Sequence, residues 1–308
     1  GDGVVKVWDL PTQGEVWNTQ GHENMVKGLC WTPERKLLSC ATDKTVKLWD
    51  PYNSNSDAPP MATYLGNSAF TSVSHHRDHP SFAAASGVIS IYDLSRPSST
   101  PSQTLHWPTS VDTISSVAFN QTETSILAST AIDRSIIMYD LRTSSPVHKT
   151  TLRLASNAIS WNPMEAFNFA VANEDHNAYI FDMRKMDRAL NVLKDHVAAV
   201  MDVEFSPTGE ELVTASYDRT IRLWNRATGH SRDIYHTKRM QRYVFLLSIM
   251  ISYANFSIVC SPHASHLTAS TSFLDQMMVM SVCGVPRPQT AVVSRVLANV
   301  PSWNTTRL

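Results

Sequence analysis

The feature that most constrains this sequence is a unit that recurs along residues 1–242. An aromatic residue followed by an acid or an amide returns every 41 to 47 residues. In five of the six copies an Asp lies six positions ahead of the aromatic, and Ser86 takes that place in the third copy. The pairs are Trp8-Asp9, Trp49-Asp50, Tyr92-Asp93, Tyr139-Asp140, Phe181-Asp182 and Trp224-Asn225. Six phased copies predict an array of similar supersecondary units.

Each unit carries the pattern of β-strands. Apolar and polar residues alternate between the Asp and the aromatic, as in 45–49 and 220–224, which is typical of a half-buried strand. A second strand is predicted upstream, for example at 29–31 and 203–205, and is followed by turn-forming residues. This order resembles the WD repeat, whose unit makes a four-stranded blade of a β-propeller. We therefore expect an all-β propeller with about five intact blades and a partial first blade.

The recurring Asp and aromatic residues have a structural interpretation. An Asp in a tight turn accepts backbone N–H bonds, and in WD repeats it also orients a His and a Ser or Thr. The aromatic ends a central strand and fills the gap between adjacent blades. We predict structural and not catalytic roles for His22, Asp43, Trp49, Asp133, Asp175, His196, Asp218 and Trp224.

The sequence argues against catalysis. A phosphate-binding glycine loop, a nucleophile elbow and a zinc-protease motif are all missing from it. His75, His76 and His79 form the densest histidine cluster, but neighbours on a strand point to opposite faces. We therefore expect no metal, no cofactor, no small-molecule substrate and no enzymatic activity. The net charge of −1 argues against nucleic-acid binding through bulk charge, although it allows a local basic patch.

Two places are candidate partner-binding sites. Asp140 and Arg142, and likewise Asp182 and Arg184, put an Arg two residues after the Asp in consecutive units. Each Arg either caps its own blade through the Asp or contacts a protein partner from one rim of the disc. The second place is the basic run with Lys238, Arg239 and Arg242, which either holds phosphates and acidic side chains or is a solvated loop.

Whole strings of the sequence resemble one family. They are Val26-Lys-Gly-Leu-Cys30, Asn162-Pro-Met-Glu-Ala-Phe167, Ala172-Asn-Glu-Asp175 and Tyr235-His-Thr-Lys-Arg-Met-Gln241. Over roughly residues 1–241 the chain resembles the suppressor-of-fibrillarin (SOF-type) WD-repeat proteins. The resemblance implies a seven-bladed family fold, a location in the nucleus and nucleolus, and work in small-subunit ribosome biogenesis. The implied partners are small-subunit processome proteins, small nucleolar ribonucleoproteins and pre-ribosomal RNA.

The same resemblance implies a second function. Some members of the family look like substrate receptors of the cullin-four ubiquitin ligase, and they dock the ligase adaptor through Trp-Asp-x-Arg boxes. The matching positions here are Tyr139-Asp140-Leu141-Arg142 and Phe181-Asp182-Met183-Arg184, with Tyr and Phe in place of Trp. That difference weakens the ligase assignment more than the processome assignment.

The composition changes after residue 242. Residues 243–308 hold only four charged residues, namely Asp275, Arg287, Arg295 and Arg307. A shifted reading frame across 273–284 permits the codons of an Asp-Gly…Trp strand pair in the correct phase. We therefore expect 1–10 to end a truncated first blade, 11–242 to form the blades, and 243–308 to be an aberrant tail from a retained intron and a frame-shifted last blade. The rival interpretation is a membrane span at 243–260, which its Ser and Asn residues disfavour.

Overall fold

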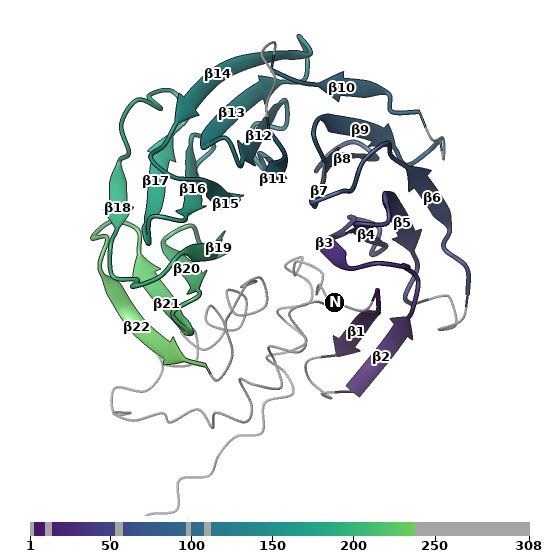
Figure 1. The fold of residues 1–308 in the computed structure, drawn as a ribbon, viewed down its shortest axis with the longest axis horizontal. Helices are drawn as coiled ribbons and strands as arrows, with labels where there is room; N and C mark the ends of the chain where they lie inside the picture. Colours follow the sequence, from purple (N-terminus) through teal and green to yellow (C-terminus); the bar gives the residue numbers. More distant parts are fainter. Residues whose placement is uncertain (1–2, 10–13, 53–57, 97–99, 108–111, 238–308) are drawn as a thin grey trace, which may run out of the picture.

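The chain forms an all-β propeller, which confirms the predicted fold class. The computed structural model describes residues 3–9, 14–52, 58–96, 100–107 and 112–237. In this part of the chain, five four-stranded antiparallel sheets and one two-stranded sheet follow one another around a centre (Figure 1). Strands β3, β7, β11, β15 and β19 are the innermost, and β6, β10, β14, β18 and β22 are the outermost.

The strand bounds follow the repeat. The two-stranded sheet pairs β1 (Val5–Asp9) with β2 (Gly14–Thr19). The first two four-stranded sheets contain β3 (Val26–Trp31), β4 (Leu37–Ala41), β5 (Thr45–Trp49), β6 (Ala62–Leu65), β7 (Ser72–His75), β8 (Ser81–Ala85), β9 (Ile89–Asp93) and β10 (Gln103–Leu105). The next three contain β11 (Ile114–Phe119), β12 (Ile126–Ala131), β13 (Ser135–Asp140), β14 (Ser145–Thr151), β15 (Ser156–Trp161), β16 (Asn168–Asn173), β17 (Ala178–Asp182), β18 (Asn191–Leu193), β19 (Val200–Phe205), β20 (Glu211–Ser216), β21 (Thr220–Asn225) and β22 (Ser231–His236).

The up-and-down order of the strands gives the disc two faces. On one face the turn between the second and third strands meets the segment that enters the next innermost strand; for example, Leu152 N donates to Arg134 O at 2.9 Å. We call this the turn face, and it holds the β4–β5, β8–β9, β12–β13, β16–β17 and β20–β21 turns. On the opposite face, which we call the arginine face, Leu141 N donates to Ser125 O at 2.9 Å. The arginine face carries Arg142 and Arg184.

The hydrophobic core lies between neighbouring sheets. Trp224 of β21 is fully buried and packs with Phe205 of its own sheet and with Ile180 and Leu193 of the sheet before it. Polar contacts repeat at the same interface, since Phe119 N donates to Ser74 Oγ at 3.2 Å and Phe205 N donates to Ser160 Oγ at 3.3 Å. Each blade is therefore fixed mainly by its neighbours, as expected of a repeat protein.

The third repeat keeps its turn without an Asp. Ser86, which stands at the Asp position, donates through its Oγ to Val88 O at 3.1 Å. The Ser86 N–H also donates to Val88 O, at 3.0 Å, so the β8–β9 turn closes on these two residues.

The interpretation of residues 243–308 stays a prediction, because these residues lie outside the described part of the chain. If the tail is a retained intron and a frame-shifted blade, long-read sequencing of the transcript across codons 236–308 will find a spliced message. That message will restore the Asp-Gly…Trp strand pair in frame. A uniform message in the present frame would contradict the interpretation. Within the described residues, the structure has no helix long and apolar enough to cross a membrane.

Candidate partner-binding site

Asp140 and Arg142 form a compact ion pair at the end of β13. The Asp140 carboxylate accepts from Arg142 Nε at 3.2 Å, from Nη2 at 3.1 Å and from the Arg142 backbone N at 2.9 Å. The hydrogen bond from the Arg142 side chain is the main reason that the pKa of Asp140 lies below its usual value. The Arg142 side chain is 70% exposed and that of Asp140 only 14%. The guanidinium is therefore exposed to solvent, while the more buried carboxylate fixes its position.

Asp182 and Arg184 repeat this arrangement one blade further on, at the end of β17. Asp182 accepts from Arg184 Nε at 3.0 Å, from Nη2 at 2.7 Å and from the Arg184 backbone N at 2.9 Å. The Arg184 guanidinium also lies over the Phe167 ring at 4.2 Å from the centroid, which favours one orientation. The side-chain hydrogen bond from Arg184 lowers the pKa of Asp182. Both predicted pairs therefore exist, and each Arg caps its own blade while its side chain stays mostly exposed.

The other blades end their third strand differently. At Asp93 and Asp50 the carboxylate accepts from the backbone N two residues on, Ser95 at 2.8 Å and Tyr52 at 3.3 Å, and an Arg is not at that position. In the last described sheet the Arg follows directly as Arg226, which pairs with Glu165 of the neighbouring blade. Two arginines held in the same way on adjacent blades are thus a local feature of the arginine face.

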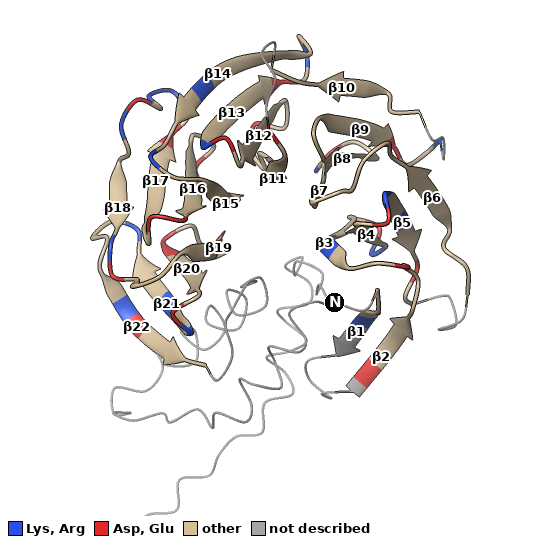
Figure 2. Cartoon of the chain, viewed as in Figure 1, with Lys and Arg blue, Asp and Glu red and all other residues tan. Residues whose placement is uncertain are grey.

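The remaining partner candidates, Lys238, Arg239 and Arg242, lie outside the described residues. In the described part of the ring, basic and acidic residues are interspersed (Figure 2). A group of His, Cys, Asp and Glu that could hold a metal is not found among the described residues.

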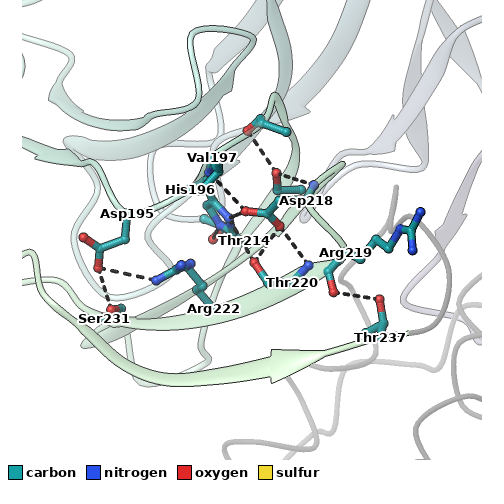
Figure 3. A network of polar contacts seen from close by, with 12 residues as sticks. Asp195, His196, Val197, Thr214, Asp218, Arg219, Thr220, Arg222, Ser231 and Thr237 are labelled. Atoms are coloured by element: carbon teal, nitrogen blue, oxygen red, sulfur yellow. Dashed lines mark hydrogen bonds and ion pairs between the residues drawn. The ribbon is translucent and has the colours of Figure 1, made fainter.

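His196 and Asp218 belong to a buried network within one repeat (Figure 3). It joins the segment before β19, strand β20, the β20–β21 turn and strand β21. His196 Nδ1 lies 2.8 Å from Asp218 Oδ2, and His196 Nε2 lies 2.6 Å from Thr214 Oγ1. Trp224 Nε1 donates to the same Thr214 hydroxyl at 2.8 Å, and Thr220 Oγ1 donates to Asp218 at 2.6 Å. Since Thr214 accepts from Trp224, its hydrogen is directed to His196 Nε2, which leaves Nδ1–H to donate to Asp218.

The first four-stranded sheet has the same network. His22 Nδ1 lies 2.8 Å from Asp43 Oδ2, and its Nε2 lies 2.7 Å from Ser39 Oγ. Trp49 Nε1 donates to Ser39 Oγ at 2.8 Å, and Thr45 Oγ1 donates to Asp43 at 2.7 Å. The geometry leaves no open position for a substrate, because every polar atom of the His22 and Asp43 side chains is used inside the blade.

Asp133 and Asp175 occupy the same turn position, but their carboxylates bond to residues other than histidine. Asp133 Oδ2 accepts from Lys149 Nζ at 3.2 Å, and its carboxylate also accepts from Ser135. Asp175 accepts from the Asn177 backbone N at 3.1 Å and from the Tyr179 hydroxyl. These two turns are therefore stabilised by other partners from the following strands.

The two His–Asp pairs predict a loss of stability in acid. Burial is the main reason that the pKa values of His22 and His196 lie below 6.5, against the opposing effect of their Asp partners. Burial alone would raise the pKa of Asp218, but hydrogen bonds from Thr220 and His196 outweigh it and lower the pKa to about 2. In each case the unfolded chain takes up the proton first as the pH falls. The melting temperature should therefore drop below about pH 6.5, and again between the usual Asp value and pH 2.

Thermal melts followed by circular dichroism from pH 7.5 to 5 test this prediction in its upper range. His22→Gln with His196→Gln should flatten the slope, and His230→Gln, at an exposed position, is the matched control. A slope that the double variant leaves unchanged would contradict a role for the buried imidazoles.

Sequence reasoning missed the contacts that cross between blades. Glu165 pairs with Arg226, and Phe167 supports Arg184; both residues come from the β15–β16 loop. That loop is the string 162–167, in which the sequence shows only a resemblance to known proteins. A periodic pattern shows which residues recur within a unit, but it does not show which loops of two units meet.

Comparisons with known proteins agree with this geometry. The family model described as "WD domain, G-beta repeat" matches residues 14–50 and 188–225. The chain is 48% identical to "Protein SOF1" of Saccharomyces cerevisiae over 265 residues, which covers 78% of this chain and 53% of that protein. It is 50% identical to "Protein sof1" of Schizosaccharomyces pombe over 211 residues, or 68% of this chain and 47% of the relative.

A relative with another name matches equally broadly. The chain is 43% identical to "DDB1- and CUL4-associated factor 13" of Danio rerio over 251 residues, which covers 79% of this chain and 54% of that protein. The chain thus spans about half the length of the relatives it matches. Together with the propeller of four-stranded sheets, these matches show that the chain is a WD-repeat β-propeller that resembles the SOF-type proteins over most of its length.

Proposed function

We propose that the chain is a non-enzymatic scaffold of small-subunit ribosome biogenesis that acts in the nucleolus within the small-subunit processome. The observation that carries this proposal is the 48% identity to Protein SOF1 over 78% of the chain. The site geometry supports a scaffold, because the His–Asp networks are buried and satisfied inside the blades. The proposed partners are processome proteins, small nucleolar ribonucleoproteins and pre-ribosomal RNA.

Depletion of the protein from growing cells tests this function. Unprocessed small-subunit pre-rRNA should accumulate on northern blots while the large-subunit precursors keep their normal ratio. A copy of the gene that resists depletion should restore processing. Normal small-subunit processing after complete depletion would overturn the proposal.

A second candidate is a substrate receptor of a cullin-four RING ubiquitin ligase. It is favoured by the two Asp–Arg pairs at the ends of β13 and β17, which display exposed guanidinium groups on adjacent blades. The name "DDB1- and CUL4-associated factor 13" of the Danio rerio relative points in the same direction. Arg is favoured at protein interfaces because its planar, weakly hydrated group forms bidentate contacts.

Charge reversal tests the ligase candidate. Arg142→Glu with Arg184→Glu should weaken pulldown of the ligase adaptor by about tenfold or more, since each change replaces a displayed cation by an anion. The matched control is Arg35→Glu with Arg96→Glu, two exposed arginines of other blades on the same face. Adaptor binding that survives the first pair of changes, or that is undetectable with the unchanged chain, would exclude this candidate.

A further inference from the structure

The turn face of the last three described sheets carries a surface that the proposed function does not use. It spans the β12–β13, β16–β17 and β20–β21 turns and the segments that enter β15 and β19. Its apolar members are well exposed, with Val197 79% and Ile132 53% exposed. We call this surface the arc, and its defining residues are Ile132, Arg134, Leu154, Val197, Tyr217 and Arg219.

The arc lies on one face because backbone hydrogen bonds join its parts. Leu152 N donates to Arg134 O at 2.9 Å, which brings the segment with Leu154 beside the β12–β13 turn. Tyr217 N donates to Ala199 O at 3.1 Å, and this places the β20–β21 turn beside the segment that contains Val197. The sheets themselves are adjacent, since β11 contacts β15 and β15 contacts β19. The exposed residues therefore lie on one face of three neighbouring sheets.

Two arginines of the arc stand at turn positions where an L-residue is strained. Arg134 has φ 70° and Arg219 has φ 63°, in the left-handed region that glycine adopts without cost. Gly3, with φ 69°, occupies the equivalent place in the first sheet, because it lies five residues ahead of Trp8 as Arg134 and Arg219 lie five residues ahead of their aromatics. Lys44, with φ 65°, and His176, with φ 71°, hold the same place in two other sheets. The turn thus accepts glycine and several polar residues, and its backbone does not require an arginine.

Both guanidinium groups are displayed outward. The structure gives neither side chain an ion pair or a hydrogen bond within the described part of the chain, and both residues are exposed. Beneath them the turn carboxylates are already occupied, Asp133 by Lys149 at 3.2 Å and Asp218 by His196 at 2.8 Å. Figure 3 shows the Arg219 side chain directed away from the Asp218 network. Cations project from the turns while the neighbouring anions are held inside.

The other exposed charges leave the arc positive. Arg153 and Lys194 are exposed in the segments that enter β15 and β19. Asp195 is paired with Arg222 at 3.6 Å and accepts from Ser231 at 2.6 Å. Glu174 is an exposed anion in the β16–β17 turn. A partner that approaches the arc therefore meets more displayed cations than anions.

The mixture of side chains selects the kind of partner. Ile132, Leu154 and Val197 offer aliphatic surface, which gains most from burial against apolar side chains. Single-stranded nucleic acid binds through base stacking on aromatic rings, and Tyr217 alone among the defining residues supplies one. We propose that the arc docks a segment of a protein partner in which acidic residues alternate with apolar ones. This surface lies opposite the arginine face and does not depend on the proposed function.

The test uses the full 308-residue chain and a fluorescein-labelled peptide of repeating Glu-Leu-Asp-Phe units, read by fluorescence anisotropy. The peptide should bind, and its versions with Ser for Leu and Phe, or with Lys for the acids, should not. Arg134→Glu with Arg219→Glu should weaken binding by about tenfold or more. Leu154→Ser with Val197→Ser should do the same, because it removes the aliphatic surface. Arg35→Glu with Arg96→Glu on the arginine face should leave the affinity unchanged.

A glycine variant separates binding from folding. Arg134→Gly with Arg219→Gly relieves both left-handed residues, so its melting temperature should equal or exceed that of the unchanged chain. It should nevertheless lose peptide binding by about fivefold or more. Full binding by the glycine variant, or no binding by the unchanged chain, would overturn the proposal. Preference for a poly-uridine RNA that is lost with the arginine reversals but kept with Leu154→Ser and Val197→Ser would also overturn it, in favour of a nucleic-acid surface.

Discussion

Replacement of Trp224 by Ala is expected to lower the free energy of unfolding by about 3 to 5 kcal/mol. The Trp224 side chain is fully buried at the end of β21, between its own sheet and the one before it. Its loss removes apolar contacts with residues of both sheets and leaves a cavity at the interface. It also deprives the Thr214 hydroxyl of the Nε1–H donor at 2.8 Å. Both effects act on the contact that joins two blades.

Urea unfolding followed by far-ultraviolet circular dichroism measures this loss without relying on tryptophan fluorescence. Trp224→Phe keeps most of the ring volume and should cost less than Trp224→Ala. Ile234→Ala, at an exposed position of β22 in the same sheet, should change stability by less than about 1 kcal/mol. A Trp224→Ala variant as stable as Ile234→Ala would show that this side chain does not hold the blades together.

Replacement of Asp218 by Ala is the second large effect, with an expected cost of about 3 kcal/mol. The change removes the acceptor of the buried His196 Nδ1–H and of the backbone N–H groups of Thr220 and Val197. The His196 side chain has no exposed surface, so water cannot replace the lost carboxylate without opening the blade. An unsatisfied buried donor costs more than the hydrogen bond itself contributes.

Asp175→Ala is the matched comparison, because Asp175 stands at the same turn position in the preceding blade. Its carboxylate accepts from the Asn177 backbone N and from the Tyr179 hydroxyl, where Asp218 is bonded to a buried histidine. Its replacement should cost about 1 kcal/mol. Equal losses for the two variants would mean that the histidine contributes nothing beyond the turn, and would contradict the role assigned to the His–Asp–Thr–Trp network.

The period of the chain made most of the fold predictable. The aromatic and the Asp six residues before it mark the third strand of each sheet, and β5 and β21 begin at Thr45 and Thr220 as expected. A fixed spacing is readable because the same local contacts are made in each unit. The Arg positions after Asp140 and Asp182 were readable for the same reason.

What the sequence could not predict depends on contacts between units. Arg226 meets Glu165 across 61 positions, and Phe167 lies under Arg184 from a different loop. Neither spacing belongs to the repeat, so the sequence pattern does not predict these two contacts. Likewise Asp133 and Asp218 occupy the same position in the pattern, yet one pairs with Lys149 and the other with His196. The side chains that reach each turn come from strands whose register only the folded sheet defines.

The strain at Arg134 and Arg219 was also hidden from the sequence. An arginine in a polar turn is an ordinary residue until its φ angle is known. Only the structure shows that these turns hold a long cationic side chain in a conformation suited to glycine. The exposed band beside them therefore adds a surface on the face opposite Arg142 and Arg184.

The proposed role of this chain is that of a scaffold in small-subunit ribosome biogenesis. Its most direct test is affinity purification of the tagged chain from growing cells, with quantification of the RNA that accompanies it. Small-subunit pre-rRNA and small nucleolar RNA should be strongly enriched over the amounts recovered with a tagged, unrelated WD-repeat protein. Recovery of the cullin-four ligase with no enrichment of these RNAs would exclude the role in ribosome biogenesis and favour the ligase receptor.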